Sequence, residues 1–304
     1  MGIASFNELE KKVIDSKRKF RVAVANAGDS HSIEAVMLAV DKGFAEPVLV
    51  GDKEAIVRIL GEMGRTVPEE NIYDCADVTE AVAKAVELVR EGKADFLMKG
   101  KLDTSALLKG VVKSGTGLND GNLMSALFIA AIPGYNKLVA VVDGGMLTYP
   151  SLEQKKALIN NTVHAFHCLG CENPKVGVLA CIEKVNPKMP ETVEAAELKH
   201  MNEEGEITGC FVEGPISYDC AMSPASAKEK NFNSPAAGDC DILIAPNIHA
   251  ANILSKALTV TCGAESAGCI IGAKCPVVIS SRGSSPEEKC NSIMLAAAVV
   301  LGDK

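Results

Sequence analysis

Short apolar runs alternate along this chain with longer segments in which apolar residues recur every three or four positions. The run FRVAVA at 20–25 has the length and composition of a buried strand. A helical pattern follows at 30–42, which Ser30 can cap and Gly43 can end. The alternation continues to the C-terminus. It predicts further strands at 47–50, 94–98, 137–142, 175–180, 209–212, 241–245 and 276–280, and helices at 53–63, 79–90, 103–113, 151–169, 191–202, 247–258 and 286–301.

Nearly continuous apolar strands separated by helices are typical of parallel sheets that helices cover on both faces. A chain of 304 residues is also too long for one ordinary core, so we predict an α/β protein with two domains. A Gly-rich turn at 143–150 and a short polar stretch at 261–268 mark the expected crossings between them. Periodicity does not decide whether the last strand and helix return to the first domain. In such sheets ligands bind outside the carboxyl ends of strands.

Composition narrows the class of protein. Apolar residues make up 47% of the chain and charged residues 23%, which excludes a disordered or fibrous chain. Aromatic residues are only 4%, so the core must be aliphatic. The net charge is −8 and there is no basic stripe with interleaved aromatic residues, which argues against nucleic acid as a partner. An anionic substrate would have to be held by local positive charge.

The cysteines and the N-terminus indicate a cellular compartment. The eleven cysteines are scattered through apolar runs, unlike those of a short disulfide-rich domain. The segment 1–20 is polar and charged and lacks the apolar centre of a signal peptide. No uncharged apolar stretch reaches about 18 residues, so no membrane span is expected. We therefore predict a protein with free thiols in the reducing cytoplasm.

The most informative turn is SSRGSS at 280–285, which follows the strand CPVVIS and precedes a helix. Backbone N–H groups at a helix N-terminus attract anions, and the guanidinium of Arg282 adds a forked donor suited to phosphate. Capping explains part of the motif, because Ser285 and Glu288 can form a capping box around Pro286. Capping does not explain Arg282, so we predict an anion site at this turn.

A second turn repeats this layout of strand, turn and helix. In MKGKLDTS at 98–105, Lys99 and Lys101 flank Gly100 at the end of a predicted strand, and together they form a small positive site. The alternative is a solvated turn in which Asp103 caps the next helix. The glycine spacing excludes a Walker loop.

Two other turns carry weaker signals. The segment ANAGDS at 25–30 lacks the GxGxxG spacing of a dinucleotide site and is better explained as a capped turn between strand and helix. Glu213 and Asp219 flank a Gly-Pro turn. They could serve acid–base chemistry or cap the following helix, and the sequence favours capping.

His164, His167, Cys168 and Cys171 recur at helical spacing, and zinc would accept these ligands. However, Gly170 is expected to end the helix and so to move Cys171 away. A single CxxC without a second pair is weak evidence for a metal site. We favour an ordinary, partly buried helix face and predict no metal.

Four blocks of the sequence resemble the phosphate acetyltransferase and phosphate butyryltransferase family. They are LMKGKLDTSALLKG at 97–110, FVEGPISYDCAMS at 211–223, the segment 233–258, and GAKCPVVISSRGSSPEEKCNSIMLA at 272–296. The resemblance runs from about residue 20 to the C-terminus. The compact length and the stretch VDGGMLTYPSLEQK at 142–155 are closer to the butyryl branch.

The resemblance implies an activity and an architecture. The family's reaction is reversible: acyl-CoA and phosphate give acyl phosphate and CoA. The implied fold is two doubly wound α/β domains with a cleft between them, similar to isocitrate and isopropylmalate dehydrogenases. The C-terminal segment then rejoins the first domain, which gives domains of 1–143 with 266–304, and of 144–265. A homodimer or larger homo-oligomer is expected, with CoA as a substrate and no cofactor.

The resemblance also assigns roles. Arg282 is expected to bind phosphate or the transferring acyl phosphate, and Ser281 to hydrogen-bond the developing oxyanion. Glu288, with Glu287 as the next candidate, is expected to act as base for the CoA thiol in the reverse direction. No cysteine lies in the Ser281–Arg282 turn, which favours direct transfer over a covalent acyl-enzyme. The expected substrate-binding residues are Lys99, Gly100, Lys101, Lys109, Gly283 and Ser284.

Some positions depart from the family pattern. Asn119 and Asn122 stand where the butyryl branch carries an Arg and a Lys, and Ser284 stands where an acidic residue is frequent. These departures support an alternative, in which a catalytically weakened member binds CoA or acyl phosphate as a sensor. A dehydrogenase of the same architecture is a further alternative, but it requires an Asp cluster for a divalent metal and an adenine pocket, and the sequence shows neither.

Overall fold

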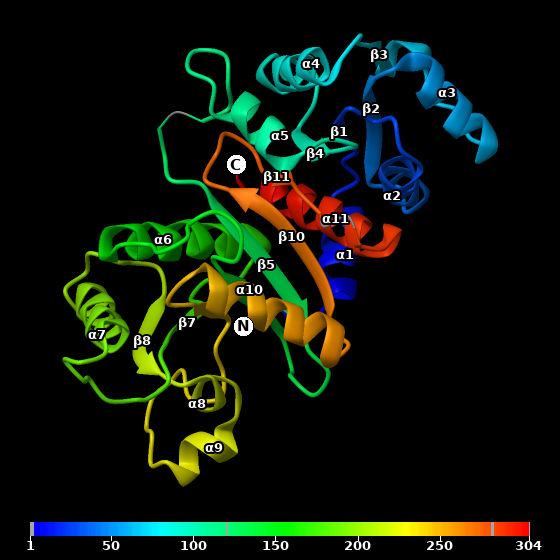
Figure 1. Ribbon diagram of the computed structural model, residues 1–304. Coiled ribbons are helices and arrows are strands. Elements are labelled where there is room, and N and C mark those ends of the chain that lie inside the picture. Colours follow the sequence, from blue (N-terminus) through cyan, green and yellow to red (C-terminus); the bar gives the residue numbers. More distant parts are fainter. Residues whose placement is uncertain (1–2, 120, 281–282, 304) are drawn as a thin grey trace. The chain divides into compact units, whose positions relative to one another are not determined.

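The computed structural model describes residues 3–119, 121–280 and 283–303, in which strands and helices alternate (Figure 1). The chain divides into two compact units. The first contains Leu9–Asn122 and the residues from Ala267 onward, and the second contains Leu123–Ser266 with the N-terminal residues up to Glu8. The domain limits expected from the sequence, 1–143 with 266–304 and 144–265, stay a prediction.

The first unit contains a mainly parallel sheet in the order β3-β2-β1-β4-β11-β10. Its parallel pairs are β1 with β2 and β4, β2 with β3, and β4 with β11. Strand β10 instead runs antiparallel to β11. The strands are β1 (Phe20–Ala25), β2 (Ala45–Gly51), β3 (Ile72–Asp74), β4 (Phe96–Lys99), β10 (Glu265–Ile271) and β11 (Val277–Val278); the helices are α1 (Phe6–Asp15), α2 (Ser30–Asp41), α3 (Lys53–Glu62), the short 3₁₀ helix η1 (Glu69–Asn71), α4 (Val78–Arg90), α5 (Thr104–Val111) and α11 (Pro286–Gly302).

The helices of this unit begin at the capping residues of the turns that follow the strands. Asp29 caps α2 by accepting a hydrogen bond from the Ser32 N–H, so the cap is one residue earlier than the predicted Ser30. The predicted capping box of α11 is confirmed: the Ser285 and Glu288 side chains each accept from the other's backbone N–H. These caps place the N-termini of the helices beside the carboxyl ends of the parallel strands.

The second unit has the strand order β5-β6-β9-β7-β8. Strands β6, β9, β7 and β8 are parallel, whereas β5 runs antiparallel to β6. The strands are β5 (Ser125–Ala131), β6 (Leu138–Val142), β7 (Lys175–Leu179), β8 (Phe211–Ile216) and β9 (Ile242–Ile244); the helices are α6 (Leu152–Leu169), α7 (Pro190–Glu203), α8 (Tyr218–Met222), α9 (Pro224–Glu229), α10 (Ile248–Lys256) and the π-helix η2 (Ala257–Thr261).

The α/β fold class predicted from the sequence is confirmed, with one correction. The two antiparallel pairs, β5 with β6 and β10 with β11, interrupt the purely parallel arrangement that the apolar runs predicted. The cores are aliphatic as expected, with a few large aromatic side chains such as Phe20 and Phe96 fully buried. None of the described helices has both the length and the apolar character needed to cross a membrane.

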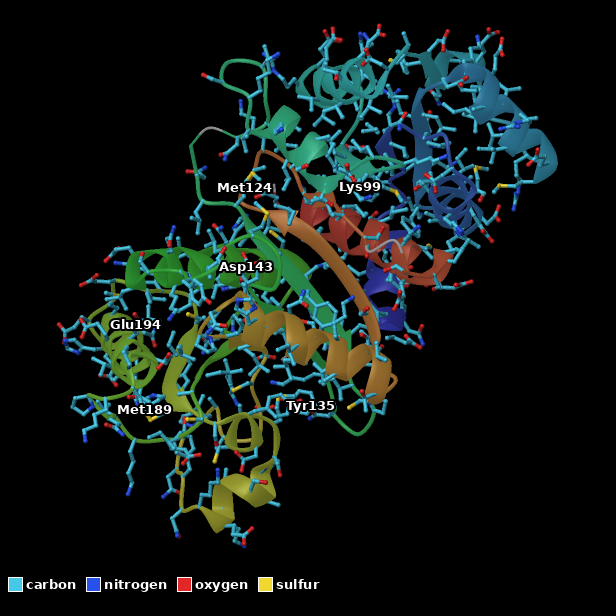
Figure 2. All side chains as sticks on the ribbon, in the orientation of Figure 1. Lys99, Met124, Tyr135, Asp143, Met189 and Glu194 are labelled. Carbon is cyan, nitrogen blue, oxygen red and sulfur yellow. The ribbon has the colours of Figure 1, made fainter. Side chains whose placement is uncertain are left out.

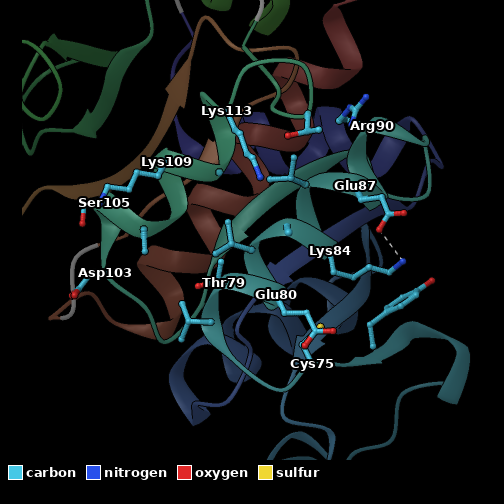
Figure 3. A pocket seen from close by; sticks show the side chains of 18 of the residues that line it. Cys75, Thr79, Glu80, Lys84, Glu87, Arg90, Asp103, Ser105, Lys109 and Lys113 are labelled. Carbon is cyan, nitrogen blue, oxygen red and sulfur yellow. Dashed lines mark hydrogen bonds and ion pairs between the residues drawn. The ribbon is translucent and has the colours of Figure 1, made fainter.

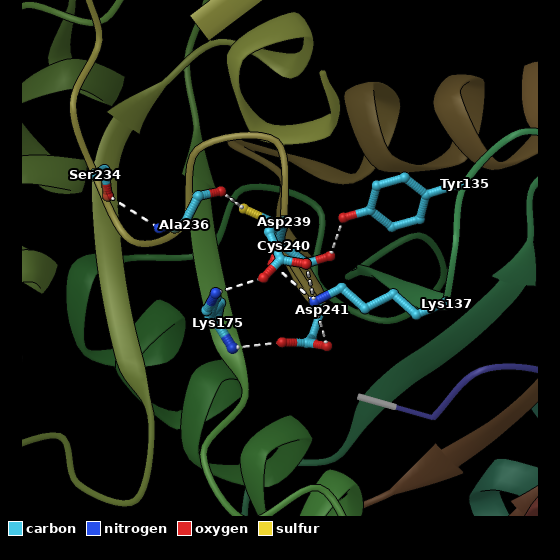
Figure 4. Close-up of polar contacts among 8 residues, drawn as sticks. All are labelled: Tyr135, Lys137, Lys175, Ser234, Ala236, Asp239, Cys240 and Asp241. Carbon is cyan, nitrogen blue, oxygen red and sulfur yellow. Dashed lines mark hydrogen bonds and ion pairs between the residues drawn. The ribbon is translucent and has the colours of Figure 1, made fainter. Parts of the chain in front are cut away.

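A partly buried ion-pair network joins the starts of three strands in the second unit (Figure 4). Lys137, just before β6, lies 2.9 Å from carboxylate oxygens of both Asp239 and Asp241. Lys175, the first residue of β7, pairs with Asp239 and donates its backbone N–H to Asp241. Asp241 directly precedes β9 and is only 3% exposed. Below we call these four residues the Lys137 network.

Candidate active site

The first unit contains a pocket of about 670 Å³ at the carboxyl ends of β1 and β4 and just beyond β11. It is enclosed by turns and by the first residues of helices α2, α4, α5 and α11, whose N–H groups favour anions. We call it the turn pocket. The residues that line it are Asp29, His31, Ser32, Val78, Lys99, Gly100, Lys101, Leu102, Asp103, Ala106, Ser280 and Lys289.

Two turns of the pocket are joined to each other by backbone hydrogen bonds. The Gly100 N–H donates to the carbonyl of Ala25 at 2.9 Å, and the Lys101 N–H donates to that of Asn26 at 2.8 Å. The Asn26 amide returns a hydrogen bond to the Lys101 carbonyl. A Cβ at position 100 would lie only 2.3 Å from the Asn26 carbonyl oxygen, so glycine is required there. The turn predicted from the sequence is thus fixed against the end of β1.

The two predicted lysines of this turn both line the pocket. Lys99 is half-buried at the end of β4 (Figure 2), and its ammonium donates to the Leu102 carbonyl at 3.1 Å. Lys101 is exposed, and Asp103 occupies the N-cap position of α5. The turn pocket therefore brings together Lys99, Gly100 and Lys101, as the sequence predicted.

The Ser-Arg turn is only partly described. Ser280 lines the turn pocket, but Ser281 and Arg282 lie outside the described residues, so their predicted roles stay predictions. Gly283 is exposed and Ser284 is half-buried. These two residues precede the cap of α11.

The two candidate bases lie in the first turn of α11. Glu288 accepts the Ser285 N–H at 3.2 Å as part of the capping box, and it does not line the turn pocket. Glu287 is exposed, and hydrogen bonds from its own backbone and from Ser285 lower its pKa. To act as base, Glu288 would have to leave its cap.

Lys289 lines the turn pocket and was not identified from the sequence. It follows Glu288 in α11, its side chain is 6% exposed, and no described residue forms an ion pair or side-chain hydrogen bond with it. Asp29 lines the same pocket, and its Oδ2 is buried without a hydrogen-bond partner among the described residues. A lysine within a helical pattern normally indicates a solvated face, so only the fold reveals its burial.

Lys109 does not line the turn pocket. It lies instead in a neighbouring groove of about 980 Å³ between α4 and α5 (Figure 3). Four cationic side chains line this groove, Lys84, Arg90, Lys109 and Lys113, together with the carboxylates of Asp74, Glu80, Glu87 and Asp103. Lys84 pairs with Glu87 at 3.0 Å. Three residues, Val78, Asp103 and Ala106, line both the groove and the turn pocket, so the two cavities adjoin. The structure thus separates Lys109 from Lys99 and Lys101.

The asparagines that depart from the family pattern form a local loop. The Asn119 amide donates to the Asn122 carbonyl at 3.1 Å, and its oxygen accepts the Gly121 N–H at 3.0 Å. Neither asparagine lines the turn pocket or the adjoining groove. Their side chains are therefore not placed to contact a ligand in either cavity.

Lysines hold the two carboxylates beside the Gly-Pro turn, and neither carboxylate occupies the predicted helix cap. Glu213 is buried and pairs with Lys199 at 2.8 Å. Asp219 lies within α8, where hydrogen bonds from Ser217 and Lys230 lower its pKa to about 2. Pairing with lysines, and the low pKa of Asp219, do not suit a general base that works near neutral pH.

The histidine and cysteine cluster does not converge on one point. Gly170 ends α6 in the left-handed conformation, as predicted, with Cys171 beyond it. The His167 ring bonds the Gly209 carbonyl at 2.7 Å, while His164 contacts Cys168 at 3.7 Å. Of the four predicted ligands, His164 and Cys168 lie together, whereas His167 and Cys171 are directed elsewhere, so the predicted four-residue cluster does not form.

None of the eleven cysteines forms a disulfide, and none is among the residues that line the turn pocket. Only Cys181 and Cys262 are exposed, whereas burial raises the pKa of thiols such as Cys269 and Cys275 to about 12. We expect a thiol reagent such as DTNB to label the exposed Cys181 and Cys262 rapidly in the native protein. The remaining nine cysteines should react only after unfolding. Loss of acyl transfer on labelling the buried thiols in the folded protein would contradict direct transfer without a cysteine intermediate.

Comparison with known proteins gives one family. The family model described as "Phosphate acetyl/butaryl transferase" matches residues 75–297. A phosphate butyryltransferase from Clostridium acetobutylicum is 41% identical over 302 residues, which is 99% of this chain and 100% of that protein. A phosphate acetyltransferase from Thermotoga maritima is 46% identical over 290 residues, or 95% of this chain and 98% of that protein.

Solved structures agree. A branched-chain phosphotransacylase from Enterococcus faecalis superposes with a TM-score of 0.81 at 29% identity, covering 92% of this chain and 99% of that one. A 4-hydroxythreonine-4-phosphate dehydrogenase from Klebsiella pneumoniae shares the fold at a TM-score of 0.55 and 13% identity, over 93% and 99% of the chains. The family match over most of the chain and the full-length relatives confirm the resemblance seen in the sequence: this chain belongs to the phosphate acetyl/butyryl transferase family.

Proposed function

We propose that this protein reversibly transfers a short-chain acyl group between CoA and inorganic phosphate, with the phosphoryl group held in the turn pocket. The observation that carries the proposal is the gathering of Lys99, Lys101 and Lys289 in a pocket lined by helix N-termini. Because the protein carries a net charge of −8, its overall field does not attract an anion, and the cations gathered in this cavity provide the local positive charge that can bind one. Relatives named phosphate butyryl- and acetyltransferase supply the reaction class.

The proposed reaction depends on how phosphate and the thioester are positioned, and it needs no cofactor. A phosphate oxygen forms a bond to the acyl carbon, the carbon–sulfur bond breaks, and the sulfur leaves as thiolate and is then protonated. Holding phosphate against the thioester makes this encounter nearly unimolecular. In this proposal Arg282 binds the phosphoryl group and Ser281 hydrogen-bonds the developing oxyanion. Glu288 acts as base for the CoA thiol in the reverse direction. Gly283 and Ser284 contribute to phosphate binding from the same turn.

The groove between α4 and α5 is proposed to hold the phosphate groups of CoA. Arg90, Lys109 and Lys113 line it and can contact the several phosphates of that molecule, whereas Lys84 is paired with Glu87. The groove adjoins the turn pocket, so a ligand lying in it can direct its thioester end toward the bound phosphate. This would give Lys109 a role separate from that of Lys99 and Lys101.

The acyl group and the assembly belong to the proposal as well. Butyryl is the favoured acyl group, because the compact length and the stretch at 142–155 are closer to the butyryl branch. Acetyl is the second, since relatives of both kinds match at least 95% of the chain. A homodimer or larger homo-oligomer in the cytoplasm remains our expectation, with no metal or redox cofactor in the reaction.

A thiol assay tests this function. Acetyl-, propionyl- and butyryl-CoA are each incubated with the protein, with and without phosphate, and free CoA is measured. We expect release only with phosphate, and fastest with butyryl-CoA. If CoA binds, as measured by calorimetry, but no acyl-CoA is cleaved, the protein is a sensor and the proposal is wrong.

Replacing Lys99 by Met is expected to raise the KM for phosphate about tenfold, because a hydrogen bond to a charged group is worth roughly 1.5–3 kcal/mol. Steady-state kinetics at saturating acyl-CoA measure this change. Lys93→Met is the control, since Lys93 pairs with Glu91 on the surface of the same unit. An unchanged KM for phosphate in Lys99→Met would remove Lys99 from the site.

A further inference from the structure

Lys289 is a buried cation without a protein partner in the described part of the chain. Its side chain is 6% exposed and lines the turn pocket, yet no ion pair or side-chain hydrogen bond joins it to a described residue. Other buried lysines differ in this respect. Lys137 pairs with two carboxylates, and Lys155, which is 4% exposed in α6, pairs with Glu194.

Nothing in the packing of α11 requires a lysine at this position. The buried residues of the helix continue from Cys290 and Ser292 to Val299, and none of those that follow Lys289 is charged. Position 289 is the fourth residue of α11, where the helix dipole disfavours a positive charge. Burial of an unpaired ammonium carries a further desolvation cost. Stability alone would therefore select another residue here.

The other charged side chains that line the turn pocket indicate which kind of ligand Lys289 can bind. Lys99 and Lys101 line the same pocket from the turn after β4, whereas Lys289 comes from α11. The carboxylates are Asp29, which caps α2, and Asp103, at the N-cap position of α5, so helix N-termini partly offset their charge. A ligand with several anionic oxygens could contact cations from both elements at once.

We propose that Lys289 binds the phosphoryl group, as inorganic phosphate in one direction and as the phosphoryl end of acyl phosphate in the other. This inference rests on the proposed function and adds a binding residue to it. Lys289 supplies an attachment from α11, in addition to the lysines of the β4 turn. Burial of its ammonium lowers the free energy of unfolding of the ligand-free protein, and contact with the bound anion offsets that loss. The residue therefore makes the empty protein less stable and the binding of the anion tighter.

Two measurements on Lys289→Met test this role. Steady-state kinetics should show a rise of about 10- to 100-fold in the KM for phosphate, with the KM for acyl-CoA little changed. Thermal unfolding without ligand should show an equal or higher Tm than the parent, because an unpaired buried charge is gone. At the same phosphate concentration, the rise in Tm that phosphate gives the parent should be smaller in the variant. Lys289→Gln takes its place if the Met variant does not fold.

Lys155→Met is the matched control, since it removes a buried lysine that has a carboxylate partner in the second unit. We expect it to lower Tm and to leave the KM for phosphate unchanged. An unaltered KM and an unaltered phosphate-induced Tm shift in Lys289→Met would overturn this inference alone. A rise in the KM for acyl-CoA in place of that for phosphate would also contradict it. If the parent protein shows no phosphate-dependent thiol release, the proposed function itself fails.

Discussion

Replacing Gly100 by Ala is expected to lower kcat/KM roughly 100-fold, since a displacement of about 1 Å in a substrate-holding group can cost that much. The added Cβ would lie 2.3 Å from the Asn26 carbonyl oxygen and 2.6 Å from that of Ala25. Both atoms belong to backbone at the end of β1, so the turn that carries Lys99 and Lys101 must move instead. Steady-state kinetics in both directions measure the effect.

Gly28→Ala is the control for this substitution. Gly28 lies in the neighbouring turn after β1, and an added Cβ there would meet no atom within 4 Å. Activity and stability are expected to stay near those of the parent. Full activity in Gly100→Ala would show that the placement of this turn does not matter for catalysis.

Replacing Lys137 by Met is expected to lower the free energy of unfolding by about 3 kcal/mol, because breaking a buried pair leaves an uncompensated charge. The stranded carboxylate is chiefly that of Asp241, which is 3% exposed at the start of β9. The network lies at the first residues of β6, β7 and β9, away from the turn pocket in sequence and in unit. Chemical denaturation monitored by circular dichroism measures the loss.

The pH dependence of stability gives a second measure of the Lys137 network. Burial disfavours the charge of Lys137, but hydrogen bonds to Asp239 and Asp241 outweigh it and raise its pKa. Burial of Asp239 is likewise outweighed by hydrogen bonds from Lys175 and Lys137, which lower its pKa. A raised lysine pKa adds stability that is lost only as pH rises through that value. A lowered aspartate pKa adds stability that is lost as pH falls.

The network should therefore be intact at neutral pH, and Lys137→Met should lose stability less steeply on acidification than the parent. Lys156→Met, which removes a lysine paired with Glu206 at 2.6 Å on the surface of the same unit, is the control and should unfold close to the parent. Equal stability of Lys137→Met and the parent, from neutral pH down through acidification, would contradict a charged network around Lys137.

Much of the fold follows from the hydrophobic pattern, because buried parallel strands and amphipathic helices have distinct periods. Strand β5 was missed: its sequence SALFIAA is a short apolar run that a buried helix could equally contain. Antiparallel pairing of β5 with β6, and of β10 with β11, depends on chain direction, which periodicity does not record. Helix α1 was missed at the polar N-terminus, where no strand precedes it.

The candidate site was predicted in part, for similar reasons. The turn with Lys99 and Lys101 has a local signature, since a Gly between two lysines directly follows a strand. The family resemblance groups Lys109 with them, but α5 carries it to the adjoining groove. Lys289 has no local signature, and its burial depends on where α11 packs against α2 and β4. Long-range packing is the information that a single sequence lacks.

Acyl transfer to phosphate is tested most directly by comparing the amounts of its two products, free CoA and acyl phosphate. Butyryl-CoA and phosphate are incubated with the protein, and free CoA is measured by thiol assay while acyl phosphate is trapped as its hydroxamate. We expect equal amounts of both, with neither formed when phosphate is left out. Release of CoA without phosphate, or without matching acyl phosphate, would show a hydrolase and contradict transfer to a phosphate held in the turn pocket.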